Sequence, residues 1–144
     1  MQLRNLLEAK GFHRILLRKM STGHYACQVK LNLIKGVFIV DTGASSSCVG
    51  LQHVDLFNLI KQESDCIAAG AGGSNMKTAL ACSNLLELQK HTTKNISFIL
   101  LDLSHVNKAI SQVDPTIIHG ILGADYLKRY GAVIDYGRNC MYLK

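Results

Sequence analysis

The tripeptide Asp41-Thr42-Gly43 is the part of the sequence best suited to catalysis. The apolar run Val37–Val40 ends directly on Asp41, so a carboxylate follows a strand that we expect to be buried on both faces. A buried carboxylate is costly unless hydrogen bonds satisfy it. Thr42 supplies a hydroxyl donor, and Gly43 lets backbone N–H groups come close. Taken alone, the tripeptide also fits an Asx-type turn that simply closes the strand.

A second segment places an apolar pair between two glycines: His119-Gly120-Ile121-Leu122-Gly123. Glycines that flank an apolar strand indicate that another backbone passes close by. A helical turn containing Asp125 follows, and then a strand that reaches Ile134-Asp135-Tyr136. The segment is therefore expected to pack tightly against another part of the chain.

Together, the two segments resemble the signatures of retropepsin-like aspartic proteases. Residues 38–45 are similar to the active-site segment of that family, and residues 120–127 with 132–136 are similar to its second signature. The resemblance covers residues 25–143. It implies that the two segments cross in a knot-like core, and that the second signature here comprises Gly120, Ile121, Leu122, Gly123 and Asp125.

The resemblance also assigns roles to the tripeptide. It implies that Asp41 is the catalytic aspartate, that Thr42 interlocks with the threonine of a partner subunit, and that the Gly43 amide donates to the carboxylate. A glycine-tipped flap over the substrate is expected at Gly70, Ala71, Gly72 and Gly73, because lids need such hinges. An ordinary hairpin loop is the alternative reading of those four residues.

The chain departs from the viral members of that family in two ways. Ala124 stands where the viral enzymes carry an arginine used in subunit contacts, so that contact is expected to be absent. The chain is also longer, by an N-terminal helix and by a helix after the Asp41 loop. The resemblance is therefore closer to cellular and bacterial relatives, with a dimer interface that differs.

Only one Asp-Thr-Gly occurs in the chain, and this number predicts a homodimer. Peptide hydrolysis by this route needs two carboxylates that share one proton, and an isologous dimer brings Asp41 to its copy at the two-fold axis. The sequence thus predicts an aspartic endopeptidase acting on polypeptides. A catalytically idle dimer that binds peptides or supports assembly is the first alternative, and a monomeric barrel that binds small molecules is the second.

Other chemistry is poorly supported. The residues Ser45, Ser46, Ser47, His53 and Asp55 lack the nucleophile elbow of a serine hydrolase. The glycine cluster at 70–73 is not followed by the lysine of a phosphate-binding loop, and Cys48 has no visible histidine partner. The histidines lack metal-ligand spacing, although His119 lies beside the second signature. We therefore expect no metal and no cofactor.

The pattern of apolar residues predicts a mainly β protein with a closed, barrel-like acid protease fold and a few short helices. All 144 residues are expected to form one domain. Strands are expected at residues 12–20, 25–33, 37–40, 66–69, 77–88, 96–101, 117–122, 133–136 and 141–143. The strand at 25–33 is expected to be half-buried, because its apolar residues alternate with polar ones and form one row: Tyr25, Cys27, Val29, Leu31 and Leu33. Helices are expected at 2–10, 51–60, 104–110 and 125–130, with Ser104 as a cap.

Composition indicates which partners and which cellular location to expect. The net charge of +6 comes from scattered lysines and arginines, whereas nucleic-acid binding favours a clustered stripe, so no nucleic acid partner is expected. The five cysteines form no CxxC pair, which favours reduced thiols in the cytosol. No apolar run has the length of a signal peptide core or a membrane span. The expected location is cytoplasmic, without membrane contact.

Overall fold

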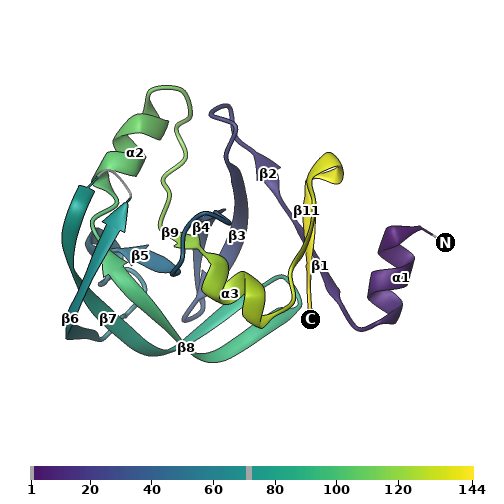
Figure 1. Cartoon of the computed structure of the whole chain (residues 1–144), viewed down its shortest axis with the longest axis horizontal. Helices are drawn as coiled ribbons and strands as arrows, with labels where there is room; N and C mark the ends of the chain where they lie inside the picture. Colours follow the sequence, from purple (N-terminus) through teal and green to yellow (C-terminus); the bar gives the residue numbers. More distant parts are fainter. Residues whose placement is uncertain (1, 71–72) are drawn as a thin grey trace.

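A closed barrel of six strands forms the centre of the molecule (Figure 1). The computed structural model describes residues 2–70 and 73–144, with the backbone alone for 63–78. The barrel strands, in spatial order, are β3 (Tyr25–Leu31), β4 (Ile34–Val40), β9 (Gly120–Leu122), β5 (Cys48–Gly50), β8 (His91–Leu101) and β7 (Gly73–Leu88). The ring closes because β7 also pairs with β3. The predicted mainly β, barrel-like fold is confirmed.

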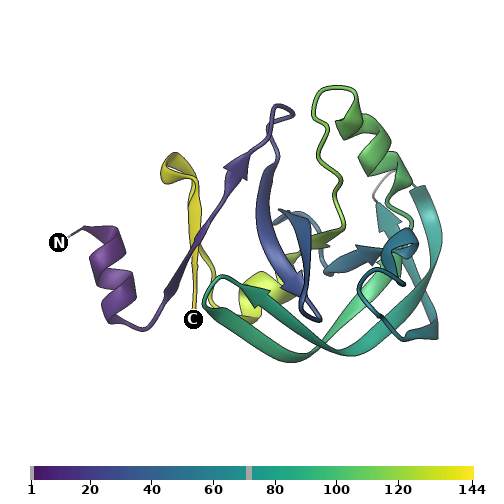
Figure 2. The same ribbon diagram turned by 180° about the vertical axis from the view of Figure 1, so that it is seen from behind.

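The remaining elements surround this barrel (Figures 1 and 2). Strand β2 (Arg18–Lys19) extends the sheet beside β3, and β6 (Lys61–Gly70) extends it beside β7. A separate sheet has the order β1 (His13–Leu16), β11 (Cys140–Leu143), β10 (Val133–Asp135). The helices are α1 (Leu3–Ala9), α2 (Ser104–Ser111) and α3 (Ala124–Arg129), with short 3₁₀ turns η1 (Leu51–His53) and η2 (Tyr136–Arg138). Helix α1 lies beside the small sheet, away from the barrel.

Large apolar side chains fill the barrel interior. Phe38 and Phe98 are fully buried and meet edge to face, with ring centroids 5.9 Å apart. Leu31, Leu86 and Leu100 are equally buried in the same cluster. A second cluster lies under α2 around Ile110 and Ile118, and a third joins Leu7 of α1 to Tyr142. Burial on this scale is the main source of stability, and an interior filled in this way argues against a small-molecule barrel.

Strand β3 follows the predicted alternation over most of its length. Tyr25, Cys27, Val29 and Leu31 are buried, while Gln28 and Lys30 are exposed. Leu33, predicted to continue the buried row, is 71% exposed, so that prediction is wrong. Asn32 and Leu33 both have positive φ angles, 50° and 71°, as a two-residue hairpin turn requires.

The Asn32 side chain secures the closure of the ring between β3 and β7. Its amide Nδ2 donates to Asn84 Oδ1 at 3.0 Å, and its Oδ1 accepts from the Leu85 backbone N–H at 2.9 Å. The backbone N–H of Asn32 also donates to Leu85 O at 2.8 Å. Asn84 is itself buried and donates to Ala81 O and Ile96 O. These polar contacts supplement only two paired positions, Lys30 with Glu87 and Leu31 with Leu86.

The predicted helix at residues 51–60 is wrong. Only η1 forms there, and the chain continues in turns in which Leu59 N donates to Val54 O at 2.9 Å. Asn58 has a positive φ of 53°, which a continuing right-handed helix does not accept. Phe57 and Leu59 are buried while Leu56 and Ile60 are exposed. Packing of these two side chains therefore outweighs the helical periodicity.

Other boundaries differ in smaller ways. The strand predicted at 12–20 is divided at Leu17, whose N–H donates to Asn139 O at 2.8 Å. Ser104 is the first residue of α2 and not its cap, because the Asp102 carboxylate accepts from the Ser104 N–H at 2.8 Å. The strand predicted at 117–122 begins only at Gly120. Strands β6, β7 and β8 are longer than predicted.

Candidate active site

Asp41 stands directly after β4, beside the second signature. Strand β4 pairs in parallel with β9, with Phe38 opposite Gly120 and Val40 opposite Leu122. The pairing continues past the strand, because the Asp41 N–H donates to Leu122 O at 3.0 Å. The structure thus brings together the two segments that the sequence singled out, although they lie far apart along the chain.

Among the described residues, one hydrogen bond holds the Asp41 carboxylate. The Gly43 N–H donates to its Oδ1 at 2.9 Å, as expected for the tripeptide, and Ala44 N donates to the Asp41 carbonyl at 3.2 Å. This is also the geometry of an Asx turn, so both readings of the tripeptide describe the same loop. In the single chain Asp41, Thr42 and Gly43 are exposed, so the loop after the buried strand presents the acid at the surface.

Both glycines of the second signature allow another backbone to approach closely. A Cβ on Gly123 would lie 2.6 Å from the carbonyl oxygen of Ala44, in the Asp41 loop. A Cβ on Gly120 would lie 2.6 Å from the carbonyl oxygen of Cys48 and equally close to the Phe38 ring. Any larger residue would force these segments apart. The predicted close approach of another backbone is confirmed at both positions.

Asp125 connects the second signature to the Asp41 loop. Its carboxylate accepts from the Ser47 N–H at 2.9 and 3.0 Å, from the Ser47 hydroxyl at 2.7 Å and from the Tyr126 N–H at 2.7 Å. The Ser47 Oγ accepts in turn from the Gly123 N–H at 2.9 Å. Ser47 is 2% exposed. The network fixes the far side of the loop that presents Asp41.

This role of Ser47 was not predicted from the sequence, in which the residue belongs to a serine cluster without a nucleophile elbow. The buried hydroxyl is instead fully engaged in hydrogen bonds to the second signature. A hydroxyl shortly after a loop aspartate is a weak signal, because its partner lies 78 residues away in the sequence.

A cavity of about 330 Å³ lies against Asp41 and Thr42. Its wall includes His24, Tyr25, Ile134 and Tyr136. The Tyr25 and Tyr136 rings pack 4.5 Å apart, and Tyr136 is 66% exposed. A neighbouring cavity of about 480 Å³ also contacts Thr42 and Ile134. His24 and Tyr136 were not predicted to lie at the site, since neither belongs to a signature.

The alternative nucleophiles are not arranged for catalysis. His53 Nε2 is buried without a hydrogen-bond partner in the described structure, and Ser47 is bound to Asp125, so the serine triad fails. Burial raises the pKa of the Cys48 thiol to about 12. A thiol with so high a pKa contains little thiolate at neutral pH and is a poor nucleophile.

His119 directly precedes β9 and is hydrogen-bonded to Val37 of β4. Its Nδ1 accepts from the Val37 N–H at 3.0 Å, and its own backbone N–H donates to Val37 O at 2.9 Å. The His53 ring lies 4.6 Å away. Burial lowers the pKa of His119, and the nearby His53 lowers it further. Burial also lowers the pKa of His53. Both imidazoles are therefore held in the neutral form at neutral pH.

The predicted flap falls at the junction of β6 and β7. Gly70 and Gly73 are directly paired across these antiparallel strands. Ala71 and Gly72 lie outside the described residues. The hairpin is thus in the expected place, and its action as a flap stays a prediction.

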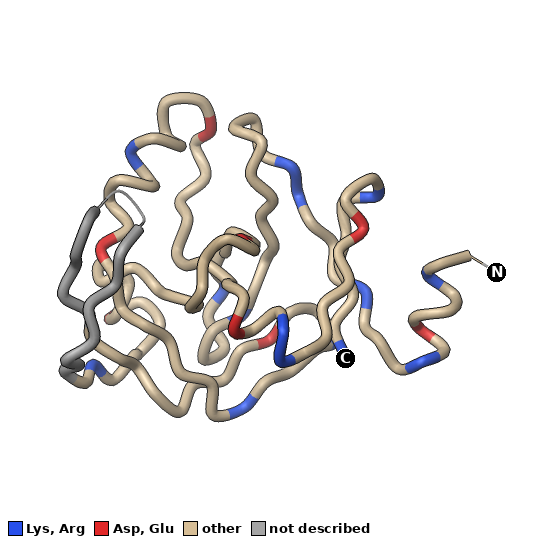
Figure 3. The backbone as a smooth tube through the Cα atoms, in the orientation of Figure 1, with Lys and Arg blue, Asp and Glu red and all other residues tan. Residues whose placement is uncertain are grey.

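Charge and metal-ligating groups are dispersed. Lysines and arginines are spread around the molecule, as Figure 3 shows. In the part of the chain that is described, no three His, Cys, Asp or Glu side chains gather in a way that could hold a metal ion. No helix there has the length and apolar character needed to cross a bilayer.

Comparison with known proteins agrees with this geometry. The aspartyl protease family model matches residues 27–126, and the chain belongs to this family. A search of curated proteins gives no significant match.

Solved structures with the same fold include a retropepsin-like aspartic protease from Rickettsia conorii, at a TM-score of 0.61 and 20% identity over 92% of this chain and 90% of that one. EIAV protease, solved in complex with the inhibitor HBY-793, gives a TM-score of 0.56 and 22% identity over 76% and 89% of the two chains. The retroviral protease-like domain of Ddi1 from Leishmania major gives 0.52 and 17% over 90% and 86%. The protein therefore has the retropepsin fold.

Proposed function

We propose that this protein is an aspartic endopeptidase that acts as a homodimer, with one Asp41 from each subunit forming the catalytic pair. The observation that carries the proposal is the state of Asp41 itself. Its carboxylate is exposed beside a cavity and is oriented by the Gly43 amide at 2.9 Å. Within the described residues its Oδ2 accepts no hydrogen bond, so one oxygen stays free for a water molecule or a second carboxylate.

Two such carboxylates can divide the chemistry between them. The ionised Asp41 takes a proton from a water molecule whose oxygen attacks the scissile carbonyl carbon. The protonated Asp41 of the other subunit gives its proton to the carbonyl oxygen. The tetrahedral intermediate collapses when the first Asp41 gives the proton that it took from water to the amide nitrogen, and the C–N bond breaks to release the amine. The second Asp41 takes a proton from a hydroxyl of the intermediate as the carboxylic acid product forms, so each acid returns to its starting form.

The need for a second subunit follows from the sequence and from exposure. The chain has a single Asp-Thr-Gly, and all three residues are exposed in the single chain. A two-fold axis near Thr42 would bury them and bring the two carboxylates together. The cavity beside Thr42 is lined by the partly exposed Ala132 and Ile134 together with Lys128, and its apolar part can contribute to such an interface. Ala124 supplies no charge there, unlike the arginine of the viral enzymes.

A tandem chain tests the proposal directly. Two copies joined by a flexible linker form an intramolecular dimer, and one copy then receives Asp41→Asn. We expect the unmodified tandem to cleave an unfolded protein at mildly acidic pH, and the single-site variant to lose cleavage by about 10²–10⁴-fold. Asp55→Asn in the same copy is the matched control and should retain activity. A tandem that keeps full activity with one Asp41 would contradict the proposal, and an idle dimer would cleave in neither form.

A further inference from the structure

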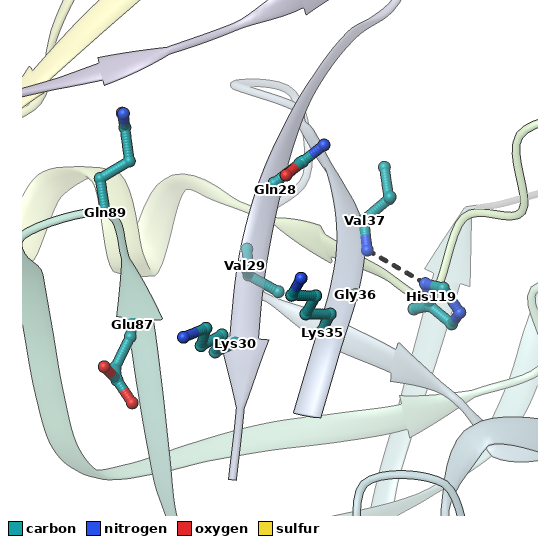
Figure 4. A pocket seen from close by; sticks show the side chains of 9 residues that line it. All are labelled: Gln28, Val29, Lys30, Lys35, Gly36, Val37, Glu87, Gln89 and His119. Carbon is teal, nitrogen blue, oxygen red and sulfur yellow. Dashed lines mark hydrogen bonds between the residues drawn. The ribbon is translucent and has the colours of Figure 1, made fainter. Parts of the chain in front are cut away.

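A groove crosses the outer face of the barrel wall, on the side of β3 and β4 that faces away from the core (Figure 4). One part is a cavity of about 500 Å³ lined by Gln28, Lys30, Lys35, Val37, Glu87 and His119. A second cavity of about 590 Å³ shares Gln28, Val37 and Gln89 with the first and continues to Arg18 and Thr116. We call these two adjoining cavities the outer groove.

Two lysines meet on the floor of the outer groove. Lys30 of β3 is directly opposite Lys35 of β4, and Gln28 is directly opposite Val37. Both lysines are exposed, whereas Val29 between Gln28 and Lys30 points into the core. Like charges placed directly opposite each other destabilise a sheet. Neither lysine forms an ion pair within the described residues, so the chain itself leaves this cost uncompensated.

Other charges at the outer groove do not cancel the pair. Glu87 of β7 is opposite Lys30 on its other side, which provides one acid for two lysines. Arg18 is engaged by Asp114 at 3.4 Å and by the Thr116 hydroxyl at 2.7 Å. His119 accepts with Nδ1 from the Val37 N–H, so the neutral ring carries its proton on Nε2 as a donor. The groove is therefore positively charged and rich in donors.

We propose that the outer groove binds an extended acidic peptide segment, whose carboxylates contact Lys30 and Lys35. Two cavities that share three lining residues suit a peptide better than a single ion. The Gln28 amide can pair with the peptide backbone, and Gln89 can donate from its NH₂ group while its Oε1 accepts from the Leu16 N–H at 2.8 Å. The site is separate from the candidate active site. Lys35 of β4 lies six residues before Asp41, which directly follows the same strand, and this separation corresponds to about 20 Å. Its occupation does not require that the protein cleave anything.

The test measures binding in the full chain carrying Asp41→Asn, so that its outcome is independent of any proteolysis. The probe is a fluorescein-labelled hexapeptide of alternating glutamate and glycine, followed by fluorescence anisotropy at low salt. A peptide with glutamine in place of glutamate is the neutral comparison. We expect the acidic peptide alone to bind, with an affinity that falls as salt increases.

Variants locate the contact. Lys30→Gln with Lys35→Gln should weaken binding about fivefold, since each lysine contributes about as much as an ordinary exposed charge pair. Lys94→Gln with Lys108→Gln removes the same charge from exposed positions elsewhere and should change affinity less than about twofold. Glu87→Gln should strengthen binding, because the only acid among the residues lining the first cavity is removed. Thermal melts confirm that each variant folds.

Several outcomes would overturn the inference. Equal weakening by both lysine pairs would reduce the effect to overall charge, and equal binding of the glutamine peptide would remove the role of carboxylates. Displacement of the probe by inorganic phosphate at a matched concentration of charge would identify a small-anion site in place of a peptide groove. Loss of cleavage in the wild type would leave all these binding results unaffected.

Discussion

Two aspartates, one in each signature, differ in how their oxygens are used. Asp125 accepts from the Ser47 N–H and hydroxyl and from the Tyr126 N–H. Asp41 accepts only from Gly43 in the described structure and borders a cavity. A carboxylate whose acceptor sites are occupied positions the backbone around it, while one with a free oxygen at a cavity can take part in a reaction. Chemistry is therefore expected at Asp41 and loop positioning at Asp125.

Asp41→Asn should have the largest effect in this comparison. The amide is nearly isosteric and can still accept from the Gly43 N–H, but it cannot act as a base. We expect cleavage of an unfolded substrate to fall by at least about 10²–10⁴-fold, with the urea midpoint of unfolding almost unchanged. Activity assays and equilibrium unfolding on the same samples check both parts. Wild-type cleavage rates in the variant would assign catalysis to another residue.

Gly123→Ala should come next, acting on both the fold and the site. The new Cβ would lie 2.6 Å from the Ala44 carbonyl oxygen, and overpacking of this kind costs about 1–3 kcal/mol. The Asp41 loop must shift, so activity should fall as well. Gly137→Ala is the matched control, because its Cβ meets nothing closer than 3.9 Å. Equal stability of the two variants in urea titrations would show that the Asp41 loop adapts freely.

Asp125→Asn should affect stability more than chemistry. Its NH₂ group would replace one acceptor oxygen and oppose either the Ser47 N–H or the Ser47 hydroxyl. Loss of hydrogen bonds to a charged group costs about 1–3 kcal/mol, and the effect belongs at the low end because Asp125 is exposed. Urea unfolding measures the change. Ser47→Ala should give a similar loss, and a double variant no worse than either single one would confirm the shared network.

The smallest expected effect is the pH dependence of stability that arises from His53 and His119. Burial lowers the pKa of His53 and of His119 below the ordinary value of 6.5. The unfolded chain therefore binds more protons, and the stability that these residues contribute is present above about pH 6.5 and lost as the pH falls through their folded pKa values. Unfolding free energies at pH 7.5 and 5.5 should differ less in His53→Phe than in the wild type. His105→Gln, on the exposed face of α2, should leave the difference unchanged.

Local patterns were sufficient for part of the structure. The strand alternation at Tyr25–Leu31 and the glycine spacing at Gly120 and Gly123 depend on near neighbours or on sterically strict residues, and both predictions hold. Side-chain contacts between segments far apart in the sequence could not be predicted from it. Ser47 and Tyr136 contribute to the site only because the fold brings them to it. The helix predicted at 51–60 failed for the same reason, since burial of Phe57 overrode its periodicity.

The short seam between β3 and β7 has a consequence for the order of folding. Asn32 reaches Asn84 and Leu85, which lie 52 and 53 residues away in the sequence. Joining such distant segments costs loop-closure entropy before any contact compensates for it, and contacts of this range slow folding. Hairpins such as β3–β4 and β7–β8 need no such closure. We therefore expect the hairpins to form first as an open, curled sheet, and the asparagine contacts to complete the ring as one of the last steps.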